Sequence, residues 1–287
     1  MASRLAPLYQ EISRVLGLRR VPYVRSFQEA LSITKDILNR LRDYNDEIYV
    51  MFSGGRDSLV VLHLASTIFN RVKCIYIVVN GNTHEKNSAY VKRITRELGV
   101  DLIVLMRRDI EFYERVVKWG WPGPRRKWCM TEFKRRPIES YFKGSSYPVV
   151  LIGTKRSDSG RRKIYVENDG IVYSSKWSTI AVRPIAHWND EYVEKYLEEN
   201  SLPKCELYEE LGESGNCVYC PFIVSRDYYR RLYEKYPRWI KKIVCAELLV
   251  KRGKPFVFGR RKISILDLLG KSLSELAREL ELDCCAQ

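Results

Sequence analysis

The sequence lacks a long apolar run, because Lys or Arg interrupts every hydrophobic segment of this 287-residue chain. A membrane helix needs about 18–20 mostly apolar residues, so we expect no membrane span. The first twenty residues also lack the apolar stretch and small-residue cleavage site of a secretory signal. These two absences predict a cytoplasmic protein, in which thiols stay reduced.

Histidine is scarce too, with three residues in the chain, which argues against a histidine-rich metal site. Cysteine is more plentiful, with eight residues. In a reducing compartment such thiols serve as small buried residues, metal ligands or catalytic groups rather than as a disulfide framework. A content of 45% hydrophobic and 30% charged residues excludes an intrinsically disordered chain.

The net charge of +15 is concentrated in two stretches, with +9 over residues 121–163 and +10 over residues 226–262. Local basic charge is a footprint for polyanions. In the second stretch the cations alternate with Tyr and Trp, which suits base stacking along a phosphate backbone. An amphipathic helix with a buried aromatic face explains the same pattern. Binding of tRNA or another nucleic acid therefore stays one of two open interpretations.

Short apolar runs read as strands and alternate with amphipathic helices. The runs cover residues 48–52, 72–79, 102–105, 149–152 and 180–185. This alternation predicts an α/β fold with a parallel sheet. We expect an N-terminal helical segment, an α/β domain and a mainly helical C-terminal region, over residues 1–46, 47–190 and 191–287.

A glycine-containing loop, Ser53-Gly-Gly-Arg-Asp-Ser58, separates the first predicted strand from its helix. Two glycines let the backbone approach an anion, and the N-terminus of the next helix offers free N–H groups to phosphate. An ordinary tight turn is the alternative. The spacing matches neither a GxxxxGK[ST] loop nor a GxGxxG loop.

The hexapeptide resembles the SGGxDS signature of the PP-loop ATP pyrophosphatases, which cleave ATP between its α- and β-phosphates. The resemblance implies that all six loop residues contact ATP and that Mg²⁺ accompanies the pyrophosphate. It also makes Arg56 and Asp57 the catalytic candidates of the loop, beside Ser53, Gly54, Gly55 and Ser58.

Three further segments are similar to the branch of that superfamily containing the phosphoadenosine phosphosulfate (PAPS) reductases. They are Val79-Asn-Gly-Asn82, Gly153-Thr-Lys-Arg-Ser-Asp-Ser159-Gly-Arg-Arg162 and Arg183-Pro-Ile-Ala-His-Trp188. The branch has Asp where this chain has Asn80. The resemblance implies a Rossmann-like twisted parallel sheet flanked by helices, with helical extensions at both ends. The nucleotide-binding residues that it implies outside the loop are Asn80, Gly153, Thr154, Ser159 and Arg162.

Cys217 and Cys220 form a C-x-x-C followed by Pro221, a spacing that lets two thiolates meet one metal centre. With Cys129, before a basic segment, the pair resembles the ligand set of cluster-bearing sulfonucleotide reductases. That resemblance implies a [4Fe–4S] cluster with one iron left open unless Cys205 fills it. A structural Zn²⁺ held by these four cysteines is the alternative.

Cys284 and Cys285 lie near the end of the sequence, where sulfonucleotide reductases carry their attacking cysteine. The surrounding Leu-Asp-Cys-Cys-Ala-Gln lacks the glycine and histidine of the reductase element. These thiols either carry sulfur as a persulfide and count as catalytic candidates, or belong to a frayed end.

The lead hypothesis is an ATP-dependent sulfurtransferase that adenylates an acceptor, releases pyrophosphate and replaces AMP by sulfur. The alternative is a reductase that releases sulfite from PAPS or adenosine phosphosulfate (APS), but the resemblance implies that reductases keep only a degenerate glycine loop. A third reading is a non-catalytic nucleic-acid-binding module. The sequence does not identify the sulfur donor or the acceptor, and a homodimer stays open.

Overall fold

The chain forms two compact units, each assembled from several stretches of sequence. The computed structural model describes residues 2–17, 20–144, 148–175, 177–214, 216–250, 256–258 and 261–282. The first unit comprises Met1–Ile77, Ala89–Leu105 and Ile138–Lys204, and the second comprises Val78–Ser88, Met106–Pro137 and Cys205–Gln287. The three contiguous segments expected from the sequence stay a prediction.

A six-stranded sheet, in the order β3-β2-β1-β4-β6-β5, forms the centre of the first unit. The strands are β1 (Glu47–Met51), β2 (Arg71–Val78), β3 (Asp101–Met106), β4 (Val149–Ile152), β5 (Val172–Ser174) and β6 (Ile180–Val182). Strand β1 pairs in parallel with β2 and β4, and β4 pairs in parallel with β6. The mostly parallel α/β sheet is thus confirmed, although β5 is an antiparallel edge strand.

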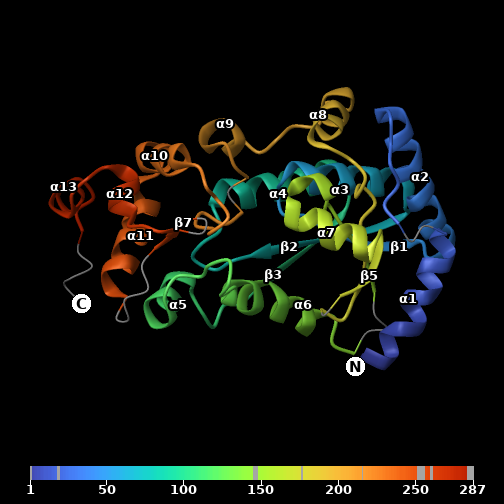
Figure 1. Cartoon of the computed structure of the whole chain (residues 1–287), viewed down its shortest axis with the longest axis horizontal. Coiled ribbons are helices and arrows are strands. Elements are labelled where there is room, and N and C mark those ends of the chain that lie inside the picture. Colours follow the sequence, from blue (N-terminus) through green and yellow to red (C-terminus); the bar gives the residue numbers. More distant parts are fainter. Residues whose placement is uncertain are drawn as a thin grey trace. The chain divides into compact units, whose positions relative to one another are not determined.

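Helices cover both faces of this sheet (Figure 1). They are α1 (Ala2–Leu16), α2 (Phe27–Tyr44), α3 (Arg56–Ile68), α4 (Glu85–Glu97), α6 (Arg136–Tyr141), α7 (Gly160–Asp169) and α8 (Asp190–Glu199). Tyr49 and Met51 of β1 pack toward Ile138 of α6, whereas Ile48 and Val50 alternate with them and are fully buried. Helix α3 packs on β1 and β4.

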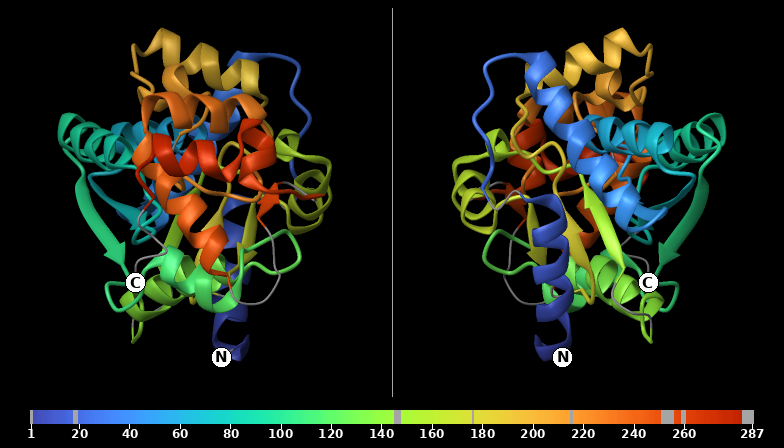
Figure 2. Two further views of the ribbon diagram at one scale, coloured as in Figure 1. Left: turned by 90° about the vertical axis from the view of Figure 1, so that its left-hand side faces the viewer. Right: turned by 90° about the vertical axis from the view of Figure 1, so that its right-hand side faces the viewer.

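Local sequence signals explain where these helices begin. Ser26 caps α2 by accepting a hydrogen bond from the amide of Glu29, as the sequence predicts. Asn189 caps α8 in the same way through the amide of Tyr192. Between α1 and α2, residues 20–26 form neither helix nor strand, and this blue loop is visible in both views of Figure 2.

The second unit is mainly helical. Its elements are α5 (Phe112–Trp119), a π-helical turn (Met130–Arg135), α9 (Leu207–Leu211), α10 (Arg226–Lys235), α11 (Pro237–Leu249), β7 (Val257–Phe258), β8 (Arg261–Lys262), α12 (Ile265–Leu269) and α13 (Leu273–Glu279). None of the helices in the described part of the chain combines the length and apolar character of a membrane span.

Helices α10 and α11 contain most of the aromatic residues of the second basic segment, residues 226–262. Tyr228, Tyr229 and Trp239 are buried in the core of the second unit, whereas Arg226, Arg230 and Arg238 are exposed. The aromatic rings therefore belong to the apolar face of amphipathic helices. These three rings are therefore not exposed for stacking on bases, whereas Tyr233 of α10 is half-buried. Nucleic-acid binding by this segment stays a prediction.

Candidate functional site

The loop Ser53–Ser58 follows β1 at the point where the strand order of the sheet reverses. From β1 the chain continues to β2 on one side, while β4 pairs with β1 on the other. In open α/β sheets, ligands bind beyond the carboxyl ends of the strands at such a switch point. The topology therefore places the loop at the position where this class of fold binds its ligands.

The backbone of the loop suits an anion. Gly54 has a φ of +83°, which favours glycine. Gly55 is the N-cap residue that precedes α3, and no side chain at this position bonds to the first amides of the helix. The hydroxyl of Ser58 donates to the carbonyl of Gly55 at 2.9 Å and accepts from the amide of Ser53 at 3.3 Å. The turn is thus fixed from within, and the N-terminal amides of α3 lack a side-chain cap.

Gly153, at the end of β4, lies directly against this loop. A Cβ at Gly153 would stand 2.7 Å from the carbonyl carbon of Asp57 and 2.8 Å from the amide nitrogen of Ser58. These are backbone atoms, which cannot turn away as a side chain would. Glycine at this position therefore lets β4 and the start of α3 approach each other.

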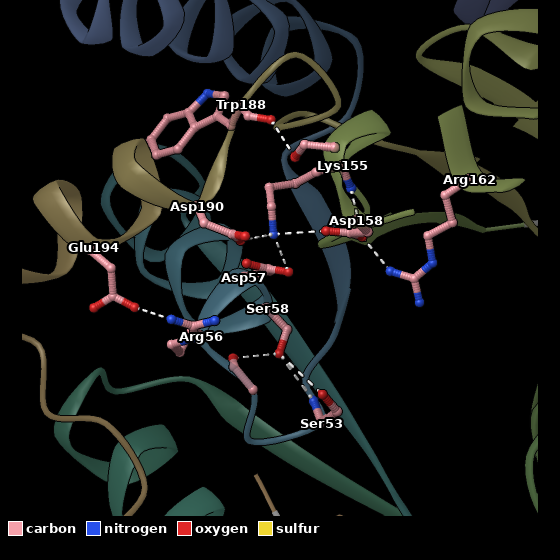
Figure 3. Close-up of polar contacts among 12 residues, drawn as sticks. Ser53, Arg56, Asp57, Ser58, Lys155, Asp158, Arg162, Trp188, Asp190 and Glu194 are labelled. Atoms are coloured by element: carbon pink, nitrogen blue, oxygen red, sulfur yellow. Dashed lines mark hydrogen bonds and ion pairs between the residues drawn. The ribbon is translucent and has the colours of Figure 1, made fainter. Parts of the chain in front are cut away.

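A buried lysine, Lys155, joins the loop to two other elements of the first unit (Figure 3). Its Nζ lies 2.5 Å from Oδ2 of Asp57, 2.9 Å from Oδ1 of Asp158 and 3.3 Å from Oδ1 of Asp190. Burial disfavours its charged form, but attraction by Asp57 and Asp158 outweighs this and raises the pKa of Lys155. Lys155 thus stays an ammonium that holds three carboxylates together.

Asp57 keeps one carboxylate oxygen, Oδ1, buried and without a hydrogen-bond partner among the described residues. Burial raises the pKa of Asp57, and this effect is larger than the opposing attraction by Lys155. A carboxylate oxygen is a ligand that Mg²⁺ prefers, and a bound cation would favour the ionised form. The residues present therefore fit Mg²⁺, with Asp57 as its protein ligand.

The remaining residues predicted to bind nucleotide in this unit surround the same cluster. Arg56 pairs with Glu194, which also accepts from Lys204 at 3.0 Å. Ser159 caps α7 by accepting from the amide of Arg162 at 3.1 Å, and the Arg162 guanidinium pairs with Asp158. Gly153 and Thr154 connect β4 to this group.

Cys129, Cys217 and Cys220 lie together in the second unit, close enough for their charges to interact. Burial is the main cause that raises the pKa of Cys129 to about 12 and that of Cys220 to about 11, and Lys134 opposes both shifts. The cysteine charges, that of Cys217 foremost, raise the pKa of Lys134. Lys134 is therefore the cation that accompanies these three thiols.

Within the described ranges, no three or more His, Cys, Asp or Glu side chains are placed so that they could hold a metal ion. None of the six described cysteines forms a disulfide. Cysteine sulfur is the protein ligand typical of iron–sulfur clusters and of structural zinc, so the chemistry of these residues fits either group.

The other described residues that the sequence singled out do not belong to the cluster around Lys155. Asn80 belongs to the second unit, where its side-chain amide donates to the carbonyl of Ile110 at 2.8 Å. Cys205 is buried just before α9 in that unit. Cys284 and Cys285 lie outside the described residues. Cys74 is a core residue of β2, as expected, and burial raises its pKa to about 12.

Sequence reasoning missed Lys155 and two of its three carboxylate partners, Asp158 and Asp190. Asp158 lies within the quoted PAPS-reductase-like segment, whereas Asp190 comes from α8, as does Glu194, the partner of Arg56. A usable signal was the Lys155-x-x-Asp158 spacing directly after a glycine that ends a strand. Nothing local in the sequence connects Lys155 or Asp158 to Asp57, which lies about one hundred positions earlier.

The fold and the loop together define a nucleotide-binding α/β protein of the PP-loop type. A family model described as the phosphoadenosine phosphosulfate reductase domain matches residues 47–232. The chain therefore belongs to the PAPS reductase domain family, a branch of the PP-loop ATP pyrophosphatase superfamily.

The curated relatives share only a quarter or so of their aligned residues with this chain. "Uncharacterized protein MJ0973" from Methanocaldococcus jannaschii is 27% identical over 234 residues, which are 79% of this chain and 55% of the relative. "Adenosine 5'-phosphosulfate reductase" from Oceanobacillus iheyensis is 23% identical over 63% of this chain and 74% of the relative. The chain spans about half the length of the first two curated relatives that it matches.

Solved structures show only weak overall similarity. The U34-tRNA thiolase NcsA from Methanococcus maripaludis with its [4Fe-4S] cluster gives a TM-score of 0.49 at 16% identity, covering 86% of each chain. The PAPS reductase from Candida auris gives a TM-score of 0.46 at 16% identity, covering 66% of this chain and 94% of that one.

Proposed function

We propose that this protein binds ATP on the Ser53–Ser58 loop, adenylates an acceptor with release of pyrophosphate, and supports sulfur transfer to that acceptor. One observation carries the proposal: a fixed glycine turn presents the N-terminus of α3, without a side-chain cap, beside the unpartnered Oδ1 of Asp57. The uncapped amides would attract an anion, and the carboxylate of Asp57 would attract a cation. A nucleotide phosphate with Mg²⁺ supplies both.

The proposed reaction consists of two displacements. An acceptor oxygen attacks the α-phosphorus of ATP, the bond from that phosphorus to the bridging oxygen breaks, and pyrophosphate leaves. A sulfur nucleophile then attacks the adenylated carbon and AMP leaves with the oxygen. Lys155 holds Asp57 in place, and Arg56 and Arg162 add positive charge for phosphate oxygens.

Cys129, Cys217 and Cys220 are the proposed ligands of a [4Fe–4S] cluster, with Zn²⁺ and Cys205 as the alternative. Their mutual electrostatic interaction and the nearby Lys134 support this assignment. A cluster with one iron that no cysteine holds would offer a place for sulfide. Cys284 or Cys285 is the proposed sulfur carrier if the site holds zinc.

Gly55→Ala tests the loop. Gly55 has a φ of −85°, which alanine adopts without strain, so the variant should fold normally. The new Cβ would obstruct the phosphate, and the affinity for MgATP measured by calorimetry should fall at least tenfold. An unchanged affinity in a variant with unchanged thermal unfolding would refute the assignment of this loop.

Product analysis tests the reaction class. With radiolabelled ATP, Mg²⁺, sulfide and bulk tRNA as the probe acceptor, we expect AMP and pyrophosphate. Formation of ADP would contradict the proposal.

Sulfonucleotide reduction is the second candidate, because the family model and several distant relatives carry that name. Release of sulfite from APS or PAPS in the presence of dithiothreitol, with no AMP formed from ATP, would favour it over sulfur transfer.

A further inference from the structure

The side chain of Asn82 holds the middle of the C-x-x-C segment in the second unit. Asn82 is 1% exposed. Its Nδ2 donates to the carbonyl of Tyr219 at 2.9 Å, and its Oδ1 accepts from the amide of the same residue at 2.9 Å. One carboxamide therefore satisfies both backbone polar groups of Tyr219.

The neighbouring residue is held as well. The amide of Val218 donates to the backbone carbonyl of Asn82 at 2.7 Å, and the hydroxyl of Tyr228 donates to the carbonyl of Val218 at 2.8 Å. The hydroxyl of Tyr219 also donates to the carbonyl of Pro122 at 3.0 Å. All four backbone polar groups between Cys217 and Cys220 thus have fixed partners.

Val218 and Tyr219 are fully buried, so their backbone polar groups need partners within the protein, and for Tyr219 a single side chain supplies both. Fixing the backbone of the two inner residues fixes the Cα–Cβ directions of the flanking cysteines. Two thiols bind one soft atom tightly only when both sulfurs already point toward the same position, because ordering the backbone during binding would reduce the affinity. Asn82 supplies that ordering from a segment 137 positions earlier in the sequence.

We propose that Asn82 is a positioning residue for the Cys217–Cys220 thiol pair and preorganises it to chelate a single soft metal or metalloid atom. The inference rests on the proposed joint action of these two cysteines. It does not depend on ATP use, so either proposal can fail without the other.

Phenylarsine oxide is a suitable probe, because one molecule condenses with two thiols, forms two As–S bonds and releases water. The experiment uses the full chain after anaerobic removal of any bound metal with a chelator, because metal would occupy the same thiols. The background carries Cys284→Ser and Cys285→Ser, so that these two neighbouring thiols do not capture the probe, and Cys129→Ser, so that Cys129 cannot pair with Cys220. We expect this background to bind one arsenical and Cys217→Ser to abolish that binding. No binding by the background, or binding that survives Cys217→Ser, would overturn the proposal.

Asn82→Ala should weaken arsenical binding roughly 10–100-fold, the usual effect of losing an outer-shell partner of a metal ligand. Alkylation of single thiols by iodoacetamide should not slow, because one sulfur needs no convergence. Tyr113→Phe is the matched control: it removes a buried hydroxyl that donates to the same Oδ1 at 3.2 Å but leaves Tyr219 bonded. We expect unchanged arsenical affinity there.

Equal arsenical affinity in Asn82→Ala and the background would overturn the proposal. If Asn82→Ala does not fold, Asn82→Asp, which keeps the acceptor and loses the donor, and Tyr228→Phe, which frees the carbonyl of Val218, take its place. Each should lower the affinity severalfold. Unchanged affinity in both would count against the role of Asn82.

Discussion

His187 shows how a buried polar residue of the first unit is accommodated. It is 2% exposed, and its Nε2 lies 2.9 Å from the carbonyl of Ala30 and 3.3 Å from the hydroxyl of Thr34. Burial, the largest effect, lowers the pKa of His187 to about 4. This histidine therefore connects α2 to the segment before α8 as a neutral ring, and it has no catalytic role in our proposal.

Stability should fall below neutral pH in part because of His187. An unfolded histidine titrates near 6.5, so its contribution is complete above pH 6.5 and is lost as the pH falls toward 4. Between pH 7 and 5.5 we expect a loss of about 1 kcal/mol in the free energy of unfolding from this group. Urea unfolding of His187→Gln should show a pH dependence smaller by that amount. An equal dependence in both proteins would contradict the assignment.

At the scale of elements, periodicity predicted most of the first unit. The helix over residues 27–44 and its cap at Ser26 match α2, and four of the five predicted strands match β1 to β4 closely. Strand β5 was not predicted, because a strand of three residues at a sheet edge is too short to give a periodic signal. The π-helical turn after Cys129 was not predicted either, since the spacing of apolar residues does not show which backbone groups bond to each other.

The residues of the candidate site were also only partly predictable from the sequence. The glycine loop and the three clustered cysteines were visible as local motifs. The role of Lys155 was not, because a buried ammonium makes sense only when carboxylates from the start of α3, the residue Asp158 and the start of α8 converge on it. Long-range convergence of this kind is set by sheet topology.

Gly153→Ala tests the contact between β4 and the start of α3. The new methyl group would overlap backbone atoms of Asp57 and Ser58, so one of the two elements must shift. We expect a loss of about 1–3 kcal/mol in the free energy of unfolding, as for other overpacked sites. MgATP affinity should fall too. Gly160→Ala, where nothing lies within 4 Å of the new Cβ, serves as the comparison for stability.

At the scale of the whole molecule, the chain carries a net charge of +15 that would attract nucleic acid. Tyr228, Tyr229 and Trp239 of α10 and α11 are buried, however, and do not offer a surface on which bases could stack. Exposed cations alone still attract polyanions, with an affinity that falls steeply with salt. Binding of nucleic acid thus stays a prediction that depends on charge rather than on stacking.

Metal content can be measured on the whole chain. Anaerobically purified protein should be brown and carry about four iron and four sulfide per chain. Cys217→Ser should lose both, whereas Cys245→Ser, on α11, should keep them. A colourless protein with one zinc per chain, released by Cys205→Ser, would contradict the cluster and leave the ATP proposal untouched.

The two units are interleaved along the chain, and this has a consequence for inheritance. The chain passes from one unit to the other five times, at positions 77, 88, 105, 137 and 204. A gene fusion or a single recombination event exchanges one continuous stretch, so it cannot exchange either unit alone. The stretch matched by the family model, residues 47–232, accordingly runs through both. The Ser53–Ser58 loop and the segments that carry Cys129, Cys217 and Cys220 should therefore be inherited together.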